Sequence, residues 1–191
     1  MLESKKAYFF KFAALHLLLY ICTIQNNSMS LPIDIFEACR SGNFEMVQNI
    51  VEQFPESVNM EDAKAFTPLI LAVYNNHPDV VDYLLKNDAN LEAGDAAGNT
   101  ALMGVCFKGY KDIAKMLLNA GALVNHRNGQ GATALTFAAT FGHLQIAEML
   151  LEKAADITVP DMRGKSPLDH ARIQENWEMY DLLGKYENRV S

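Results

Sequence analysis

Cysteine is scarce in this sequence, since Cys22, Cys39 and Cys106 are the only three among 191 residues. No two of them form a C-x-x-C pair, and no group of Cys and His residues has the spacing of zinc ligands. The sequence therefore indicates neither a disulfide framework nor a metal site. Half of the residues are hydrophobic, so a sizeable apolar core is possible without such crosslinks.

An excess of basic residues is also missing. The chain has 16 Lys and Arg against 23 Asp and Glu, which gives a formal net charge of −7 at pH 7. Proteins that bind nucleic acid need clustered Lys and Arg to contact the phosphates. The charge balance therefore indicates a solvated acidic surface and no nucleic-acid partner.

Sequence motifs of common enzyme classes are absent. The chain contains no G-x-S-x-G, no phosphate-binding glycine loop and no H-E-x-x-H. Asp169 and His170 are adjacent, but neighbouring residues on a helix point away from each other, and no nucleophile accompanies them. The sequence thus predicts a protein that is not an enzyme, with no catalytic residues and no cofactor.

Long apolar runs are missing too, and this bears on the N-terminus. The run from Phe12 to Ile24, "FAALHLLLYICTI", is shorter than the roughly 20 residues of a membrane-spanning helix. Lysines precede it, and Ser28 and Ser30 offer small residues for cleavage, which is typical of a secretory signal peptide. We therefore expect residues 1–30 to be a signal peptide of an exported, periplasmic protein. Two alternatives remain: an untranslated extension before a cytoplasmic protein that starts at Met29, or a retained anchor on a membrane-tethered scaffold.

A repeat with a period of 33 residues dominates the remainder of the chain. Four stretches begin 33 residues apart: "AFTPLILAVYNNH" from Ala65, "GNTALMGVCFKGY" from Gly98, "GATALTFAATFGH" from Gly131 and "GKSPLDHARIQEN" from Gly164. A second motif, "DIAKMLLNAGALVN" in one copy, follows the first three at the same spacing. An earlier copy, Asp34 to Asn59, fits with one extra residue.

Each repeat reads as two short helices joined by tight turns. A Thr or Ser caps the first helix, Pro follows it in two copies, and Gly109 and Gly142 suit the left-handed end of that helix. Apolar residues at helical spacing mark the second helix. The chain is therefore predicted to be all-α, with units at about 31–60, 61–93, 94–126, 127–159 and 160–191. Trp177 is expected to close the last unit.

These residues resemble the ankyrin repeat, whose 33-residue unit carries a T-P-L-H-x-A motif. The motif stands here as "TPLILA", "TALMGV", "TALTFA" and "SPLDHA", without its histidine. The resemblance implies a solenoid of about five stacked helix-turn-helix units with short hairpin-like turns. It also implies a protein-interaction module, expected to be monomeric alone, that binds a partner protein through its concave face. Small exported ankyrin proteins of bacteria suggest an alternative, an inhibitor or immunity partner of a periplasmic enzyme.

We define the concave face as the turn tips together with the late positions of the first helices. The tip residues are Lys64, Phe66, Ala97, Asn99, Gln130, Ala132, Arg163 and Lys165. The late helical residues are Tyr74, Asn75, Phe107, Lys108, Thr140, Phe141, Ile173 and Gln174. All of them except Ala97, Ala132, Ile173 and Gln174 form the predicted partner-binding site.

Three aromatic residues, Tyr74, Phe107 and Phe141, recur along this face in successive units. They are predicted to be either interface anchors or packing between the helices. Arg163 and Lys165 form a basic tip that would suit an acidic spot on a partner, although a solvated turn is equally consistent. His77 and His143 share one repeat position, and we expect them to hydrogen-bond to the backbone of the turns.

Overall fold

The computed structural model describes residues 34–190, and the compact unit within this range begins at Ile35. The predicted signal peptide at residues 1–30 lies outside these described residues. Among residues 34–190, no helix is both long and apolar enough to cross a membrane.

The part of the chain that the structure describes is all-α, as the sequence predicted. It contains ten α-helices and no strand, apart from an isolated bridge between Gly94 and Thr100. The helices form five consecutive pairs: α2 (Ile35–Ser41) with α3 (Phe44–Gln53), α4 (Pro68–Tyr74) with α5 (Pro78–Lys86), α6 (Ala101–Lys108) with α7 (Lys111–Asn119), α8 (Ala134–Phe141) with α9 (Leu144–Glu152), and α10 (Pro167–Ile173) with α11 (Trp177–Val190). A short 3-10 helix, η1 (Pro55–Asn59), follows the first pair.

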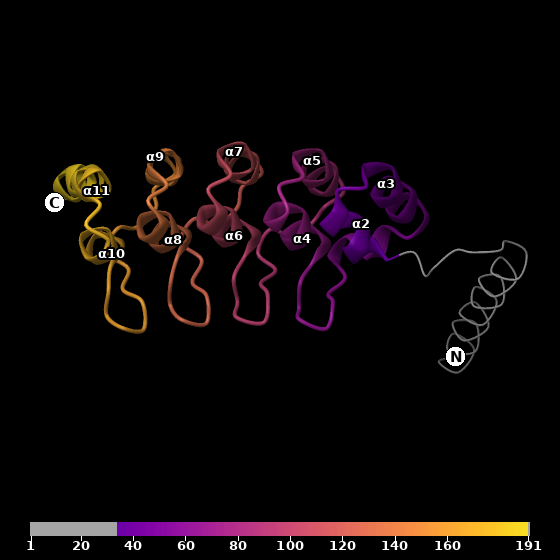
Figure 1. Ribbon diagram of the computed structural model, residues 1–191, viewed down its shortest axis with the longest axis horizontal. Helices are drawn as coiled ribbons and strands as arrows, with labels where there is room; N and C mark the ends of the chain where they lie inside the picture. The colour runs from indigo at the N-terminus through magenta and orange to yellow at the C-terminus, as the bar shows by residue number, and fades with distance from the viewer. Residues whose placement is uncertain (1–33, 191) are drawn as a thin grey trace, which may run out of the picture. The chain divides into compact units, whose positions relative to one another are not determined.

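The pairs follow one another in a row (Figure 1). The first helices of successive pairs pack against each other, α4 on α6, α6 on α8 and α8 on α10, and the second helices form a parallel row. Long hairpin-shaped loops extend from the row of first helices, on the side away from the second helices (Figure 1).

The ends of the first helices follow the sequence signals. Thr67, Thr100, Thr133 and Ser166 each cap a first helix, because their hydroxyl oxygens accept a hydrogen bond from the backbone N–H three residues later. The three threonines are buried at equivalent places in successive pairs. At the other end of the helix, Gly109 and Gly142 have φ values of 83° and 75°, the left-handed conformation that glycine adopts without strain.

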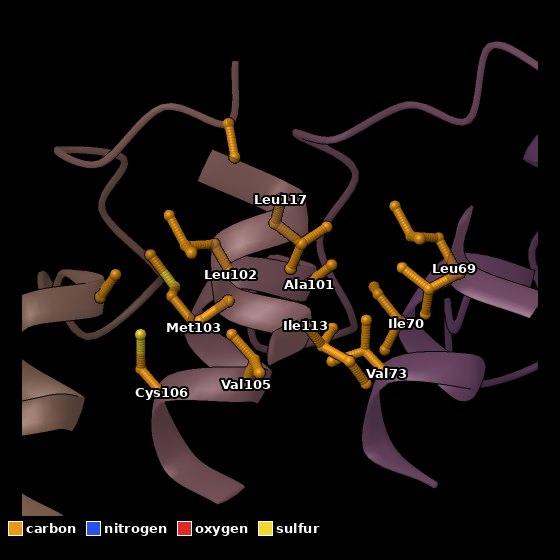
Figure 2. Close-up of a cluster of buried hydrophobic side chains, with 14 of the residues drawn as sticks. Leu69, Ile70, Val73, Ala101, Leu102, Met103, Val105, Cys106, Ile113 and Leu117 are labelled. Carbon is orange, nitrogen blue, oxygen red and sulfur yellow. The ribbon is translucent and has the colours of Figure 1, made fainter. Parts of the chain in front are cut away.

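The core consists of the same few positions, repeated. Leu69, Leu102 and Leu135 of the first helices are buried, as are Leu84, Leu117 and Leu150 of the second helices. Figure 2 shows Ile70 and Val73 of α4 beside Ile113 of α7, so the apolar cluster continues from one pair into the next. Each pair therefore buries apolar surface between its own two helices and against the neighbouring pairs, as expected of a solenoid.

The last pair differs from the prediction at Trp177. Its side chain is 59% exposed and contacts only the edge of the Tyr180 ring among the described aromatic residues. Met179 and Leu183 of α11 are fully buried instead. Trp177 is the first residue of α11, a position from which its side chain does not reach the core, so the expectation that it closes the stack is wrong.

Candidate partner-binding face

An Asp or Asn organises each hairpin loop at its base, and these four residues recur every 33 positions. They are Asp62, Asp95, Asn128 and Asp161. In each, the Oδ1 atom accepts hydrogen bonds from the backbone N–H groups two and four residues later, at 2.8–3.0 Å. The eight donors are the backbones of the eight predicted tip residues. Sequence reasoning missed these four residues, although their constant spacing was a usable signal.

The tips of neighbouring hairpins are joined through their backbones. Ala96 N donates to Lys64 O at 3.2 Å, Gly129 N to Ala97 O at 2.9 Å, and Met162 N to Gln130 O at 2.9 Å. These equivalent bonds tie all four tips into one ladder. The backbone of the tips is thus ordered before any partner binds, which lowers the entropy lost on binding.

The predicted site residues differ in their exposure. The exposed residues are Lys64, Asn75, Ala97, Phe107, Lys108, Gln130, Phe141, Arg163, Ile173 and Gln174. The half-buried residues are Phe66, Tyr74, Asn99, Thr140 and Lys165. Thr140 turns its hydroxyl back onto Thr136 O at 2.7 Å. Ala132 is buried, contrary to its placement at an exposed tip, because its methyl group is shorter than the side chains of Phe66, Asn99 and Lys165 at the equivalent positions.

The structure brings four aromatic rings and one lysine into a continuous row across α4, α6 and α8. The rings of Phe66 and Tyr74 meet edge to face at 6.1 Å, and those of Phe107 and Phe141 at 4.7 Å. Lys108 connects the two couples, because its Nζ lies 5.8 Å from the ring centres of both Tyr74 and Phe107. We call these five residues the aromatic stripe.

The rings of the aromatic stripe do not all play the same part. Phe107 and Phe141 are 40% and 47% exposed. Tyr74 is half-buried against Gly104 of α6, where a Cβ atom would stand 3.1 Å from the ring. Its burial, together with the charge of Asp95, raises the pKa of Tyr74. Tyr74 therefore packs between two units, as one alternative anticipated, whereas Phe107 and Phe141 offer apolar surface to the solvent.

His77 and His143 hydrogen-bond to backbone carbonyls, as predicted, but these carbonyls lie in the last turn of the first helix of the preceding unit and not in a loop. The Nε2 atom of His77 lies 3.1 Å from Arg40 O, and that of His143 lies 3.3 Å from Phe107 O. Each ring also occupies the space above a glycine of the preceding unit, Gly42 or Gly109. The two histidines thus link consecutive units, and His143 contacts the end of α6 that carries Phe107 and Lys108.

The last hairpin is held by a largely buried carboxylate. The Oδ2 atom of Asp161 pairs with His170 Nε2 at 2.9 Å, while its Oδ1 atom accepts the two N–H groups of the turn. Burial alone would raise the pKa of Asp161, but hydrogen bonds from Lys165 N, His170 and Arg163 N outweigh it, so the pKa is lowered. Asp161 therefore stays ionised and anchors the tip that carries Arg163 and Lys165.

Repeated helix pairs, capped first helices and bridged hairpin tips define an α-solenoid with one ordered, solvent-facing row of side chains. A family model for ankyrin repeats, described as three copies, matches residues 35–128, 87–161 and 122–190. The chain therefore belongs to the ankyrin repeat family. Ankyrin repeats are protein-interaction modules, and proteins built from them are generally not enzymes.

Similar proteins match about a third of this chain and are much longer. The chain is 38% identical over 60 residues to BTB/POZ domain-containing protein 3 of Schizosaccharomyces pombe, covering 31% of this chain and 12% of that protein. It is 35% identical over 63 residues to ankyrin repeat and SAM domain-containing protein 6 of Mus musculus, covering 33% and 7%. It is 39% identical over 72 residues to alpha-latrocrustotoxin-Lt1a of Latrodectus tredecimguttatus, covering 34% and 5%. The chain thus spans about an eighth or less of each of these proteins.

Proposed function

We propose that the chain binds a partner protein through the concave face, with Phe107 and Phe141 as the principal anchors. The observation that carries this proposal is their exposure in mutual contact, at 40% and 47%, on adjacent units. A Phe side chain has an area of about 200 Å², so each ring leaves roughly 80 Å² in water. Covering that area would contribute about 2 kcal/mol per ring.

The surroundings of the two rings support the same role. The bridged tips and the histidine contacts hold the face rigid, so a partner meets side chains that are already in place. Large apolar side chains on a rigid frame are typical of the few residues that contribute most of the energy of an interface. The packing of Tyr74 against Gly104 assigns that residue a supporting part.

The experiment is a selection of binding peptides from a random phage-displayed library against the full chain. Selected peptides are then tested on the variant Phe107→Ala/Phe141→Ala and on Phe54→Ala. Phe54 is a matched control, because it is 43% exposed but lies at the end of α3, outside the concave face. We expect the double variant to lose binding and the control to keep it.

Two results would contradict the proposal. If the selection yields no binders that recognise the folded chain, the concave face is not a binding surface for extended segments. If binders are found that tolerate the double variant but not Phe54→Ala, the chain binds through another face. Circular dichroism of each variant shows whether the fold is retained.

A further inference from the structure

The concave face exposes positively charged side chains although the chain as a whole is acidic. Lys64, Lys108 and Arg163 are exposed on it, and none of them takes part in an ion pair found within residues 34–190. Lys64 and Arg163 belong to the tips at the two ends of the hairpin ladder, and Lys108 lies between them on α6. The free cations are thus spread along the same face as the aromatic stripe.

The carboxylates of the hairpin loops, Asp62, Asp95 and Asp161, each accept two backbone N–H groups of their own loop. Asp95 uses Oδ1 for two backbone N–H groups of its turn and Oδ2 for the side chain of Asn99 at 3.1 Å. Asp161 likewise uses Oδ1 for two N–H groups and Oδ2 for His170. A carboxylate whose two oxygens are both engaged within its own loop offers little to an incoming cation. Neither Asp95 nor Asp161 forms an ion pair with Lys64, Lys108 or Arg163.

Much of the negative charge lies on the second helices instead. The first turns of α3, α5, α7 and α11 contain Glu45, Asp79, Asp112 and Glu178. Carboxylates at these positions stabilise the positive end of the helix dipole. Charges beyond about 8 Å are largely screened at physiological ionic strength, so an approaching segment meets the local cations of the concave face.

Lys108 combines charge and apolar surface at one point. Its ammonium group lies over the rings of Tyr74 and Phe107 and is itself exposed. The two rings hold the ammonium group by cation–π attraction, while its solvent side remains open to an anion. A ligand that contacts this point can therefore place a carboxylate on Lys108 and an apolar side chain against Phe107 and Phe141 together.

From these observations we propose that the partner presents an extended acidic segment with apolar side chains between its carboxylates. This inference rests on the function proposed above and specifies the chemistry of the partner. The aromatic stripe crosses three units, and neighbouring units are about 10 Å apart, so it is roughly 20 Å long. An extended chain covers this length with about six residues.

The test uses two synthetic peptides of equal length, in which Leu and Phe alternate with Glu in one and with Lys in the other. Binding of each fluorescent peptide to the full chain is followed by anisotropy at low and at physiological salt. We expect the Glu peptide to bind, to weaken as salt rises, and to bind more tightly than the Lys peptide by at least about tenfold. Lys108→Glu should reduce binding of the Glu peptide by about tenfold.

Lys115→Glu is the matched control, because Lys115 is exposed on α7 and the substitution changes the net charge equally. Its affinity for the Glu peptide should stay within about twofold of the unaltered chain. The proposal is overturned if the two lysine variants behave alike, if the Lys peptide binds as well as the Glu peptide, or if neither peptide binds. A single-stranded oligonucleotide that displaces the Glu peptide would point to a nucleic-acid ligand and would also overturn it.

The phage selection separates failure of this inference from failure of the proposed function. Selected peptides that require Phe107 and Phe141 but contain no excess of Asp and Glu would retain the concave face as a binding site. They would reject only the acidic character of the partner. An excess of Asp and Glu among them would support both statements.

Discussion

The most informative perturbation is the removal of Asn128, which organises the third of the four hairpin loops. Its side chain is buried and makes three hydrogen bonds. Oδ1 accepts from Gln130 N and Ala132 N, both at 2.9 Å, and Nδ2 donates to Asn99 Oδ1 at 2.7 Å. Asn128→Ala removes all three bonds, and it leaves the buried Ala132 N–H without this acceptor.

The expected loss follows from the number of bonds. A hydrogen bond contributes about 1 kcal/mol net, so Asn128→Ala should lower the free energy of unfolding by about 3 kcal/mol. Asn128→Asp keeps the Oδ1 acceptor, as Asp62, Asp95 and Asp161 do naturally, and loses only the donor to Asn99. Its expected loss is about 1 kcal/mol, with a small addition from the new carboxylate facing Asn99 Oδ1.

The assay is urea unfolding of the full chain at pH 7, followed by circular dichroism. Gln130→Ala is the control, since this exposed tip residue contributes only its backbone to the turn, and it should change stability by less than about 0.5 kcal/mol. Equal losses for Asn128→Ala and Asn128→Asp would refute the reasoning, because the shared Oδ1 acceptor would then contribute nothing. A loss below about 1 kcal/mol for Asn128→Ala would do the same.

Three further predictions concern the turns and the N-terminus. Gly109→Ala should lower the free energy of unfolding by more than about 2 kcal/mol, because its Cβ would stand 2.4 Å from the His143 ring and the backbone has a positive φ. Gly164→Ala is the control, since Gly164 also has a positive φ but open space around it, and it should cost only about 1 kcal/mol in the same unfolding assay. Equal losses for the two variants would show that the histidine contact is unimportant. Asp161→Asn should make the free energy of unfolding less dependent on pH on the acid side. The pKa of Asp161 is lowered in the folded chain, so its stabilising contribution is present above the unfolded pKa of about 3.9 and is lost as the pH falls through the folded pKa. Urea unfolding from pH 7 down to acid checks this, and a parallel decline of both proteins would contradict it. N-terminal sequencing of the native protein should find a start near Leu31 if residues 1–30 are a cleaved signal peptide, whereas a start at Met29 would favour a cytoplasmic protein and an intact N-terminus a tethered scaffold.

Much of the fold could be predicted because repetition makes local signals reinforce one another. Thr67, Thr100 and Thr133 each predict a helix start, and their constant spacing predicts that the starts lie in equivalent places. The same holds for the buried leucines and for Gly109 and Gly142. The ladder of hairpin tips could have been anticipated from the spacing of Asp62, Asp95, Asn128 and Asp161. The hydrogen bonds between neighbouring tips, however, join residues that only stacking brings together.

The sequence by itself determined the period and the helix ends, and it predicted which residues form the concave face. Only the tertiary structure decided which of the equivalent aromatic residues are buried. Tyr74 and Phe107 hold the same repeat position, yet Tyr74 packs onto Gly104 while Phe107 stays exposed. The next unit has Phe137 in place of Gly104, so the space that accepts Tyr74 is filled one unit later. The exposure of the aromatic side chain thus depends on the size of the side chain 30 residues later in the sequence. The repeat position of the aromatic residue alone does not contain this information.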